Sequence, residues 1–588
     1  MSGGARRLHT VGSSIDELLF DAAEAHQRGD LAATETQCRA VLAVDAAEPR
    51  AVQILGAILA ERGEVELAVD LFVTAAECLG PPTEQTFGFY NNYANALRLT
   101  QRNEQAEELL RELVAVAPRK WQPWHNLGQV LKDLRRFDEA AGALRRAITL
   151  EPGYGPNHGV LGEVLNKLGR LRSAGSSLRR CIELGWDTDV NLWTILGNNH
   201  RMLGELAEAI ECLERAFELS EGSPNAHSNL GIVYSQVGRF DEALAHFRLA
   251  IHMEPDGRVL HSNAAYGLLI AGEIVEGWRE WEWGALHAGP RGEERRLEVP
   301  RWTPERAPGR VCCYREQGVG DELLFASCYP DLIANVDSVV IECDTRLVSL
   351  FARSFPDAEV RAQTYDPIFG ETMHDFDYAI PAGSLPQWFR SSLDAFPDRR
   401  AFIVADPERV RAWRDRLADI GPGPYAGMSW RSRLKTAERR LEYTRLDEWG
   451  PILSVPDVTW INLQYDDCER ELTSAERTFG VKVHRWEWLD LMNDFEEMAA
   501  LTCALDVVVA ARNAVAMLGG AVGVPTVMMG NRWDWSDLGS DTSPWFPTIQ
   551  LVYRHLGEEW DAVIATTAGT VRDVATSARL NLTCPTGT

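Results

Sequence analysis

Six residues, Glu316-Gln-Gly-Val-Gly-Asp321, form the stretch whose residue types and spacing best suit a binding or catalytic site. Gly318 and Gly320 permit a tight turn and a close approach of the backbone to a ligand. A helix beginning here would direct unpaired N–H groups outward, which favours an anion, and would place the Asp321 carboxylate at the same opening. The alternative is an ordinary strand-to-helix turn in which Asp321 caps the helix.

A basic stretch follows a predicted strand further along the chain. Between Pro424 and Arg445 there are six basic residues and two acids, in a protein whose formal net charge is −27. A cationic patch at the carboxyl end of a strand suits a phosphate-bearing ligand, whereas the alternative is a solvated loop with ordinary charges. The six basic residues are Arg431, Arg433, Lys435, Arg439, Arg440 and Arg445.

Two later stretches complete the set of candidate site segments. Asp506–Pro525 predicts a buried strand, a turn at Arg512–Asn513 and a glycine-rich helix packed closely on the sheet. The first amides of that helix, at Asn513 and Ala514, would again meet an anion, although close helix–sheet packing also requires glycines. Ser543–Tyr553 predicts an aromatic turn leading into a strand, whose rings suit either a nucleobase or the core.

The composition excludes several classes of function. A chain of 588 residues should divide into about three or four domains. The net charge of −27 and pI near 5.0 argue against general binding to nucleic acid or anionic membranes. Eleven scattered cysteines without metal-ligand spacing predict a reducing compartment and no metal site. With neither a signal peptide nor an apolar span, we expect a cytoplasmic protein.

A sequence repeat of about 34 residues occupies the first half. Small residues at its eighth and twentieth positions let two antiparallel helices approach, and proline ends the second helix. We expect about seven units over 15–255 and a partial eighth over 258–272, stacked into an α-solenoid with a concave groove. The groove predicts protein binding, and the alternative is a spacer or oligomerisation arm. The clearest copy contains His227, Leu230, Gly231, Tyr234, Gly238, Ala243, Phe247, Ala250 and Pro255.

An aromatic helix end at Glu276–Trp283 is expected to pack the last repeat against the next domain. After it, the spacing of apolar residues changes. Short β-branched runs alternate with helical segments, which predicts parallel sheets covered by helices in two halves joined by a hinge over 403–423. Expected helices include Arg346–Phe355, Pro407–Ile420, Phe495–Leu505 and Asn513–Val522. Expected strands are Val311–Tyr314, Val339–Cys343, Tyr378–Ile380, Tyr425–Trp430, Val458–Leu463, Val481–His484, Val507–Ala511 and Thr526–Met529.

Taken in order, these stretches resemble tetratricopeptide repeats fused to a glycosyltransferase of the GT-B type, with two Rossmann-like halves. That part is similar to heptosyltransferases and distantly to protein O-GlcNAc transferases. The resemblance divides the chain into repeats (15–288), a connector (289–309), an N-terminal half (310–420) and a nucleotide-sugar-binding half (421–588). It is carried by Glu276–Trp283, Glu316–Asp321, Gly427–Trp430, Asn462–Gln464, Asp494–Pro525 and Ser543–Arg554.

The resemblance implies a metal-independent transferase without a cofactor. It assigns the general base to Asp321 and stabilisation of the donor phosphate to Lys435 or Arg431. The family pattern Asp-Thr-x-x-x-His is replaced here by Arg512-Asn513-Ala-Val-Ala-Met517, which weakens the case for a heptose or GlcNAc donor and favours a more anionic one. The donor-binding residues it implies are Gly318, Gly320, Trp430, Arg431, Lys435, Gln464, Arg512, Asn513 and Ala514.

The layout of the whole chain most resembles flagellin-modifying glycosyltransferases. That resemblance implies a protein acceptor such as flagellin, bound through the repeat groove, and a CMP-linked donor such as CMP-pseudaminic acid. Two alternatives stay open: an inactive repeat scaffold acting as an adaptor, and a transferase whose acceptor is a saccharide or a lipid.

Overall fold

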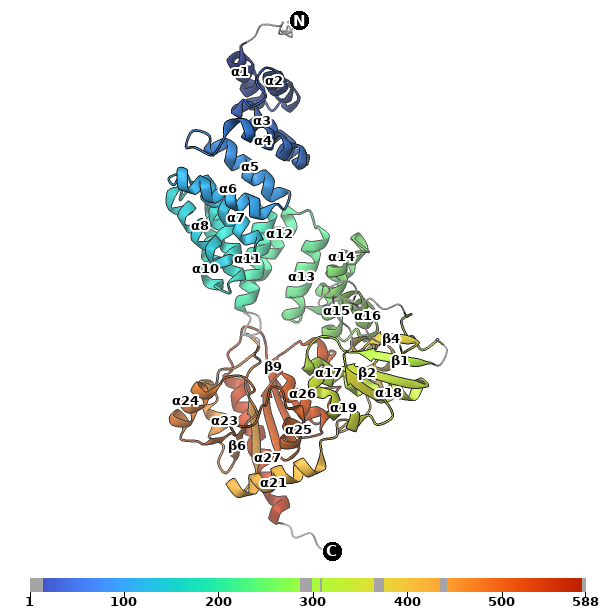
Figure 1. The fold of residues 1–588 in the computed structure, drawn as a ribbon. Coiled ribbons are helices and arrows are strands. Elements are labelled where there is room, and N and C mark those ends of the chain that lie inside the picture. Colours follow the sequence, from blue (N-terminus) through green and yellow to red (C-terminus); the bar gives the residue numbers. More distant parts are fainter. Residues whose placement is uncertain (1–13, 286–298, 307–308, 364–374, 434–440, 584–588) are drawn as a thin grey trace. The chain divides into compact units, whose positions relative to one another are not determined.

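The first half of the chain is an array of paired helices (Figure 1). The computed structural model describes residues 14–285, 299–306, 309–363, 375–433 and 441–583. The chain forms two compact units, Met1–Asn199 and His200–Thr588, so the last repeats share a unit with the α/β region. The repeat helices are α1 Ile15–Gln27, α2 Leu31–Val44, α3 Pro49–Glu61, α4 Val65–Leu79, α5 Phe87–Leu99, α6 Asn103–Val116, α7 Trp121–Asp133, α8 Phe137–Leu150, α9 Gly155–Lys167, α10 Leu171–Glu183, α11 Val190–Leu203, α12 Leu206–Leu219, α13 Pro224–Gln236, α14 Phe240–Met253, α15 Arg258–Ala271 and α16 Ile274–Trp281.

Within a repeat, the two helices meet where a glycine faces a large apolar side chain. A Cβ added to Gly128 would lie 2.6 Å from Leu144 Cγ, and one added to Gly231 would lie 2.7 Å from the ring of Phe247. No side chain fits at such a distance, which is why these positions are glycine. The helices α1–α14 make the seven predicted units, and α16 completes the eighth unit that was predicted as partial.

The second half contains two sheets in which every described pairing is parallel. The first has the order β3-β2-β1-β4 and the second the order β10-β9-β8-β5-β6-β7, which confirms the predicted α/β class with two sheets. The strands are β1 Arg310–Tyr314, β2 Ser338–Cys343, β3 Glu359–Ala362, β4 Tyr378–Pro381, β5 Tyr425–Ser429, β6 Thr459–Asn462, β7 Val483–His484, β8 Val507–Ala511, β9 Thr526–Asn531 and β10 Ile549–Arg554.

Helices accompany both sheets, as parallel connections require. Among the described residues, no helix has both the length and the apolar composition needed to cross a bilayer. The helices of this half are α17 Val319–Phe325, α18 Tyr329–Asn335, α19 Val348–Ser354, α20 Pro386–Phe389, α21 Pro407–Ile420, α23 Gly450–Leu453, α24 Glu469–Phe479, α25 Phe495–Cys503, α26 Ala514–Ala521 and α27 Asp561–Thr583.

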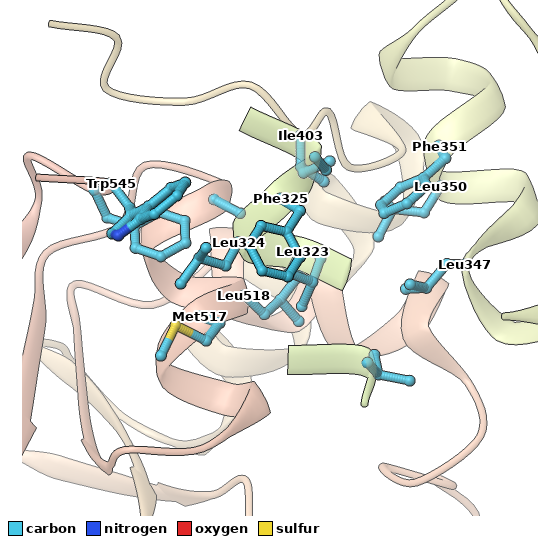
Figure 2. Close-up of a cluster of buried hydrophobic side chains, with 14 of the residues drawn as sticks. Leu323, Leu324, Phe325, Leu347, Leu350, Phe351, Ile403, Met517, Leu518 and Trp545 are labelled. Carbon is cyan, nitrogen blue, oxygen red and sulfur yellow. The ribbon is translucent and has the colours of Figure 1, made fainter. Parts of the chain in front are cut away.

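One core joins the two sheets. Figure 2 shows Leu323 and Leu324 of α17 beside Met517 and Leu518 of α26, with Trp545 at the edge of the same cluster. Because these side chains come from both halves and are almost wholly buried, separating the halves would expose a large apolar surface. The helices α17 and α26 therefore hold fixed positions relative to each other.

The aromatic helix end packs on the α/β region, as predicted. Trp278 and Trp281 of α16 are buried in the core shared by the two sheets. The indole N–H of Trp278 donates to the Arg390 carbonyl at 3.1 Å, and the Trp281 ring lies 4.8 Å from that of Trp535. The segment predicted as a hinge contains α21, whose fully buried Trp413 packs in the same core, so the two sheets are joined by a packed helix.

Candidate functional site

A cavity of about 320 Å³ lies at the carboxyl ends of the central strands of both sheets. Its lining includes Gly318–Asp321, which follow β1, and Arg512–Ala514, which follow β8. Ser432 and Arg433, which follow β5, line it as well. Strands β5 and β8 are neighbours where the strand order of the second sheet reverses. Ligands of open α/β sheets bind at such a switch point.

The first wall is the turn into α17. The backbone N–H of Gly318 donates to Oδ2 of Asp321 at 3.1 Å, so the carboxylate caps the helix and also lines the cavity. The residue before the turn, Gln317, has a φ of 57°. That left-handed conformation is uncommon for a residue with a side chain and stores local strain. The two interpretations of Asp321, as cap and as site residue, are therefore compatible.

A buried carboxylate lies directly behind this wall. Glu322 has no exposed surface, contacts Arg315 Nε at 3.0 Å and accepts the Asp344 N–H at 2.9 Å. Burial raises the pKa of Glu322 to about 7, although Arg315 opposes the shift. Asp344 in turn binds Arg346 at 2.8 Å, and this hydrogen bond lowers the pKa of Asp344 to about 2.

The second wall is the start of α26. Asn513 is its N-cap, and its Oδ1 accepts the N–H groups of Val515 at 3.0 Å and Ala516 at 3.3 Å. Its Nδ2 donates to Ser429 Oγ at 2.9 Å, which ties the helix to the end of β5. These bonds satisfy the N–H groups of Val515 and Ala516, whereas Asn513 and Ala514, whose amides were expected to meet an anion, both line the cavity.

Arg512 lines the cavity but its charge is compensated. Its guanidinium donates to both carboxylate oxygens of Asp537 at 3.0 Å, and Asp534 lies 3.4 Å away. Burial alone would lower the pKa of Arg512, but these two carboxylates outweigh it and hold the pKa above its usual value. The prediction that Arg512 adds positive charge for an anionic donor therefore needs correction, because two acids neutralise it.

Three further predicted residues form the support behind the second wall. Gln464 is buried, and its amide oxygen accepts the N–H of Trp430 at 3.2 Å and of Arg431 at 3.3 Å. The buried Trp430 donates its indole N–H to Glu471 at 2.6 Å. Arg431 forms ion pairs with Asp466 and Glu471. These contacts fix the loop after β5, and they correct the expectation that the three side chains hold the donor directly. Lys435 lies outside the described residues.

The cations that face the cavity include Arg433 and Arg346, neither of which was predicted as a site residue. Arg346 is held by Asp344 and donates to the Met492 carbonyl at 3.1 Å. In the described part of the chain, no carboxylate pairs with the exposed Arg433, whose hydrogen-bond contact is Met492 Sδ at 3.4 Å. Arg433 belongs to the basic stretch, but spacing alone could not separate it from the ion-paired Arg431.

Aromatic and apolar side chains fill the rest of the lining. Tyr443 and Tyr465 come from the loops near β5 and after β6, and Leu324, Phe495 and Met498 add apolar surface. Rings beside cations suit a nucleobase next to its phosphates. The aromatic turn at 543–553 does not serve this purpose, because Trp545 and Phe546 are buried in the core.

The comparisons with known proteins bear on both halves. Residues 121–154 and 189–253 each match a tetratricopeptide repeat family. The crystal structure of MamA protein is 22% identical, covering 29% of this chain and 93% of that one with a TM-score of 0.27. That of the APC/C hetero-tetramer Cut9–Hcn1 is 18% identical, covering 48% and 55% with a TM-score of 0.36.

A curated relative covers more of the molecule. Protein FlbA of Caulobacter vibrioides is 31% identical over 404 residues, which is 66% of this chain and 67% of FlbA. An alignment of that length is longer than the repeat array, so it extends into the α/β half. The chain is therefore a tetratricopeptide repeat protein that belongs to the family of protein FlbA.

Proposed function

We propose that the chain is a protein O-glycosyltransferase that transfers a sugar from a nucleotide donor to a Ser or Thr hydroxyl. The observation that carries the proposal is the shared cavity, in which Asp321 after β1 and Arg433 after β5 line one space. A carboxylate that can accept a proton, in the same cavity as a guanidinium that no carboxylate of the described residues pairs with, suits transfer from a phosphate leaving group. The resemblance to GT-B enzymes agrees with a site between two parallel sheets.

The transfer can be written with named groups. The acceptor hydroxyl oxygen forms a bond to the anomeric carbon, and its proton passes to the Asp321 carboxylate. The bond between that carbon and the phosphate oxygen breaks, and the electron pair leaves with the nucleotide. Arg433 and Arg346 stabilise the charge that develops on the departing phosphate. Tyr443 and Tyr465 provide rings for the base.

The donor preference rests on Arg433 in this account. Because Arg512 is neutralised by Asp534 and Asp537, the exposed guanidinium of Arg433 is the group that favours an anionic donor. A carboxylated sugar linked to CMP, the donor implied by the resemblance, meets that preference. The repeats supply binding surface for a protein acceptor, and the layout of the chain favours flagellin.

Nucleotide binding tests the proposal directly. The full chain is heated with CMP, UDP, GDP or ADP, and the midpoint of unfolding is recorded. A ligand at 100 times its Kd should stabilise the folded chain by about 2.7 kcal/mol. Saturable stabilisation by a pyrimidine nucleotide, reduced in Arg433→Ala, supports the transferase. Stabilisation by none of the four nucleotides would overturn it and favour a repeat adaptor.

A further inference from the structure

Three turns, one in each of the last three repeats, contact the α/β region. Gly204, Gly238 and Gly272 each have a positive φ and end the first helix of a helix pair. A Cβ added to any of them would lie 3.4 Å from the α/β region, where it would meet Gly557 Cα, Trp533 Cζ2 and the Leu538 carbonyl respectively. The last three repeats therefore lie against the loops after β9 and β10 at close range.

A second cavity of about 440 Å³ lies within this junction. Repeat residues Met202, Gln236 and Tyr266 line it from one side, and Trp533 and Asp534 line it from the other. Arg512 and Asp534 line both this junction cavity and the cavity of about 320 Å³ at the ends of β1, β5 and β8, called the donor cavity because the proposed function places the donor there. A ligand in the junction cavity would therefore lie next to a donor in the other.

Two residues of the lining carry buried polar atoms without a partner. Within the described residues, Trp533 Nε1 and Gln236 Oε1 find no hydrogen-bond partner. Such atoms are rare in folded proteins, and each destabilises the fold unless a ligand or water satisfies it. Trp533 also has a φ of 69°, which is strained for a residue of its size. Its ring contacts Phe240 at 4.8 Å, so the repeats hold it in place.

The pattern of polar groups indicates the class of ligand. One orphaned atom is a donor and the other an acceptor, which is the pairing that a peptide backbone offers at every residue. The charged side chains of the lining have both signs, since Arg532 and Arg201 lie with Glu442 and Asp534. A lining with charges of both signs does not favour a second phosphate group, whereas it suits a polar peptide.

We propose that the junction cavity binds the acceptor segment, an extended peptide whose Ser or Thr side chain passes Arg512 and Asp534 toward Asp321. The inference rests on the proposed function and identifies where its second substrate binds. Rotation of the Gln236 side chain would let its amide oxygen accept a peptide N–H, whereas the Trp533 indole, whose Nε1 faces the Gly238 turn, would have to move from its contact with the repeats to donate to a peptide C=O.

Photocrosslinking with flagellin tests the assignment on the full chain. Flagellin is purified from a strain that lacks this protein, and p-benzoylphenylalanine replaces either Met202 or Val275. Met202 lines the junction cavity, whereas Val275 on α16 is 58% exposed and lies outside the lining. We expect a crosslink from position 202 and none from position 275. If the chain binds flagellin and position 202 gives no crosslink, the assignment is wrong.

Kinetics give an independent readout. Trp533→Phe keeps the ring and removes the N–H, and Gln236→Met removes the amide at similar length. Each should raise the KM for flagellin about tenfold, the effect of one lost hydrogen bond, and leave nucleotide binding unchanged. A rise in the KM of the donor alone would assign the cavity to the sugar and overturn the proposal. If the unmodified chain stabilises with nucleotide but transfers nothing to flagellin, this acceptor is wrong; if it binds no nucleotide, the transferase itself is wrong.

Discussion

Gly320 and Ala514 lie against each other where the first turns of α17 and α26 meet. A Cβ added to Gly320 would be 3.6 Å from Ala514 Cα and 3.7 Å from its backbone nitrogen. The contact joins the segment after β1 to the segment after β8, and both residues line the donor cavity. The turn that carries Asp321 and the start of α26 are thus positioned by the same packing.

Two substitutions at Gly320 test whether nucleotide binding depends on the free space in the cavity beside this residue. A distance of 3.6 Å is ordinary van der Waals contact, so Gly320→Ala should fold normally and bind nucleotide within about twofold of the unmodified chain. The branches of Val in Gly320→Val would meet the Ala514 backbone and occupy the cavity. We expect that variant to lose at least about tenfold in nucleotide affinity. Equal affinity in the two variants, measured by calorimetry, would place the donor elsewhere.

Arg433 and Arg431 form a matched pair for testing the phosphate site. Arg433→Ala removes an exposed guanidinium that no carboxylate of the described residues pairs with, so we expect nucleotide affinity to fall by about 1.5–3 kcal/mol with little change in the unfolding midpoint. Arg431→Ala leaves Asp466 and Glu471 unpaired and should destabilise the fold by about 3 kcal/mol. The reverse pattern, with affinity lost in Arg431→Ala and stability lost in Arg433→Ala, would assign phosphate binding to Arg431 and support of the fold to Arg433.

The Arg512–Asp537 pair should behave as a buried ion pair. Both side chains are mostly buried, at 13% and 7% exposed, so Arg512→Met alone leaves two acids without their cation. We expect a loss of about 3–5 kcal/mol in the free energy of unfolding, measured with urea. The double variant Arg512→Met, Asp537→Leu should lose less than either single one. Additive losses in this cycle would show that the two side chains do not interact.

Glu322 should make stability depend on pH. Its pKa is about 7 in the folded chain and near 4.5 when unfolded, so between these values the folded state holds more protons. Stability should therefore fall as the pH rises from about 4.5 to 7, and should not change further from this group above that range. Glu322→Gln should flatten this part of the profile. Glu408→Gln, at a side chain that is 88% exposed, serves as the control and should leave the slope unchanged.

Much of the architecture follows from local patterns. The 34-residue spacing of glycine and large apolar residues predicts the helix pairs, because Gly128 and Leu144 must meet for two helices to close. The helix Pro407–Ile420 has the predicted bounds, since Asp406 caps one end and Gly421 follows the other. Strand β3, Glu359–Ala362, was not predicted, because this short strand at the edge of the sheet alternates charge with small apolar residues and is only partly buried.

The site was harder to predict than the fold. The predicted residues Gly318, Gly320 and Asp321 line the cavity, and they could be selected from the sequence because a strand, a glycine-rich turn and a helix start are local features. Which arginines form ion pairs was not predicted, because the acids that pair with them lie far along the chain. Arg512 is paired with Asp534 and Asp537 in the next loop, and Arg431 with Asp466 and Glu471 some 35–40 residues away. Spacing within the basic stretch gives no sign that Arg433 differs.

The central claim is that Asp321 accepts the proton of an acceptor hydroxyl, and the substitution Asp321→Asn measures it most directly. A strain lacking the protein is complemented with the unmodified chain or with the variant, and the intact mass of flagellin is recorded, while nucleotide stabilisation is measured on each purified chain. Asparagine keeps the hydrogen bond from Gly318 and cannot accept the proton. We predict normal stabilisation by nucleotide and a transfer rate at least about 100-fold lower. Flagellin that carries its full added mass at the normal rate, made by a folded Asp321→Asn chain, would contradict the account.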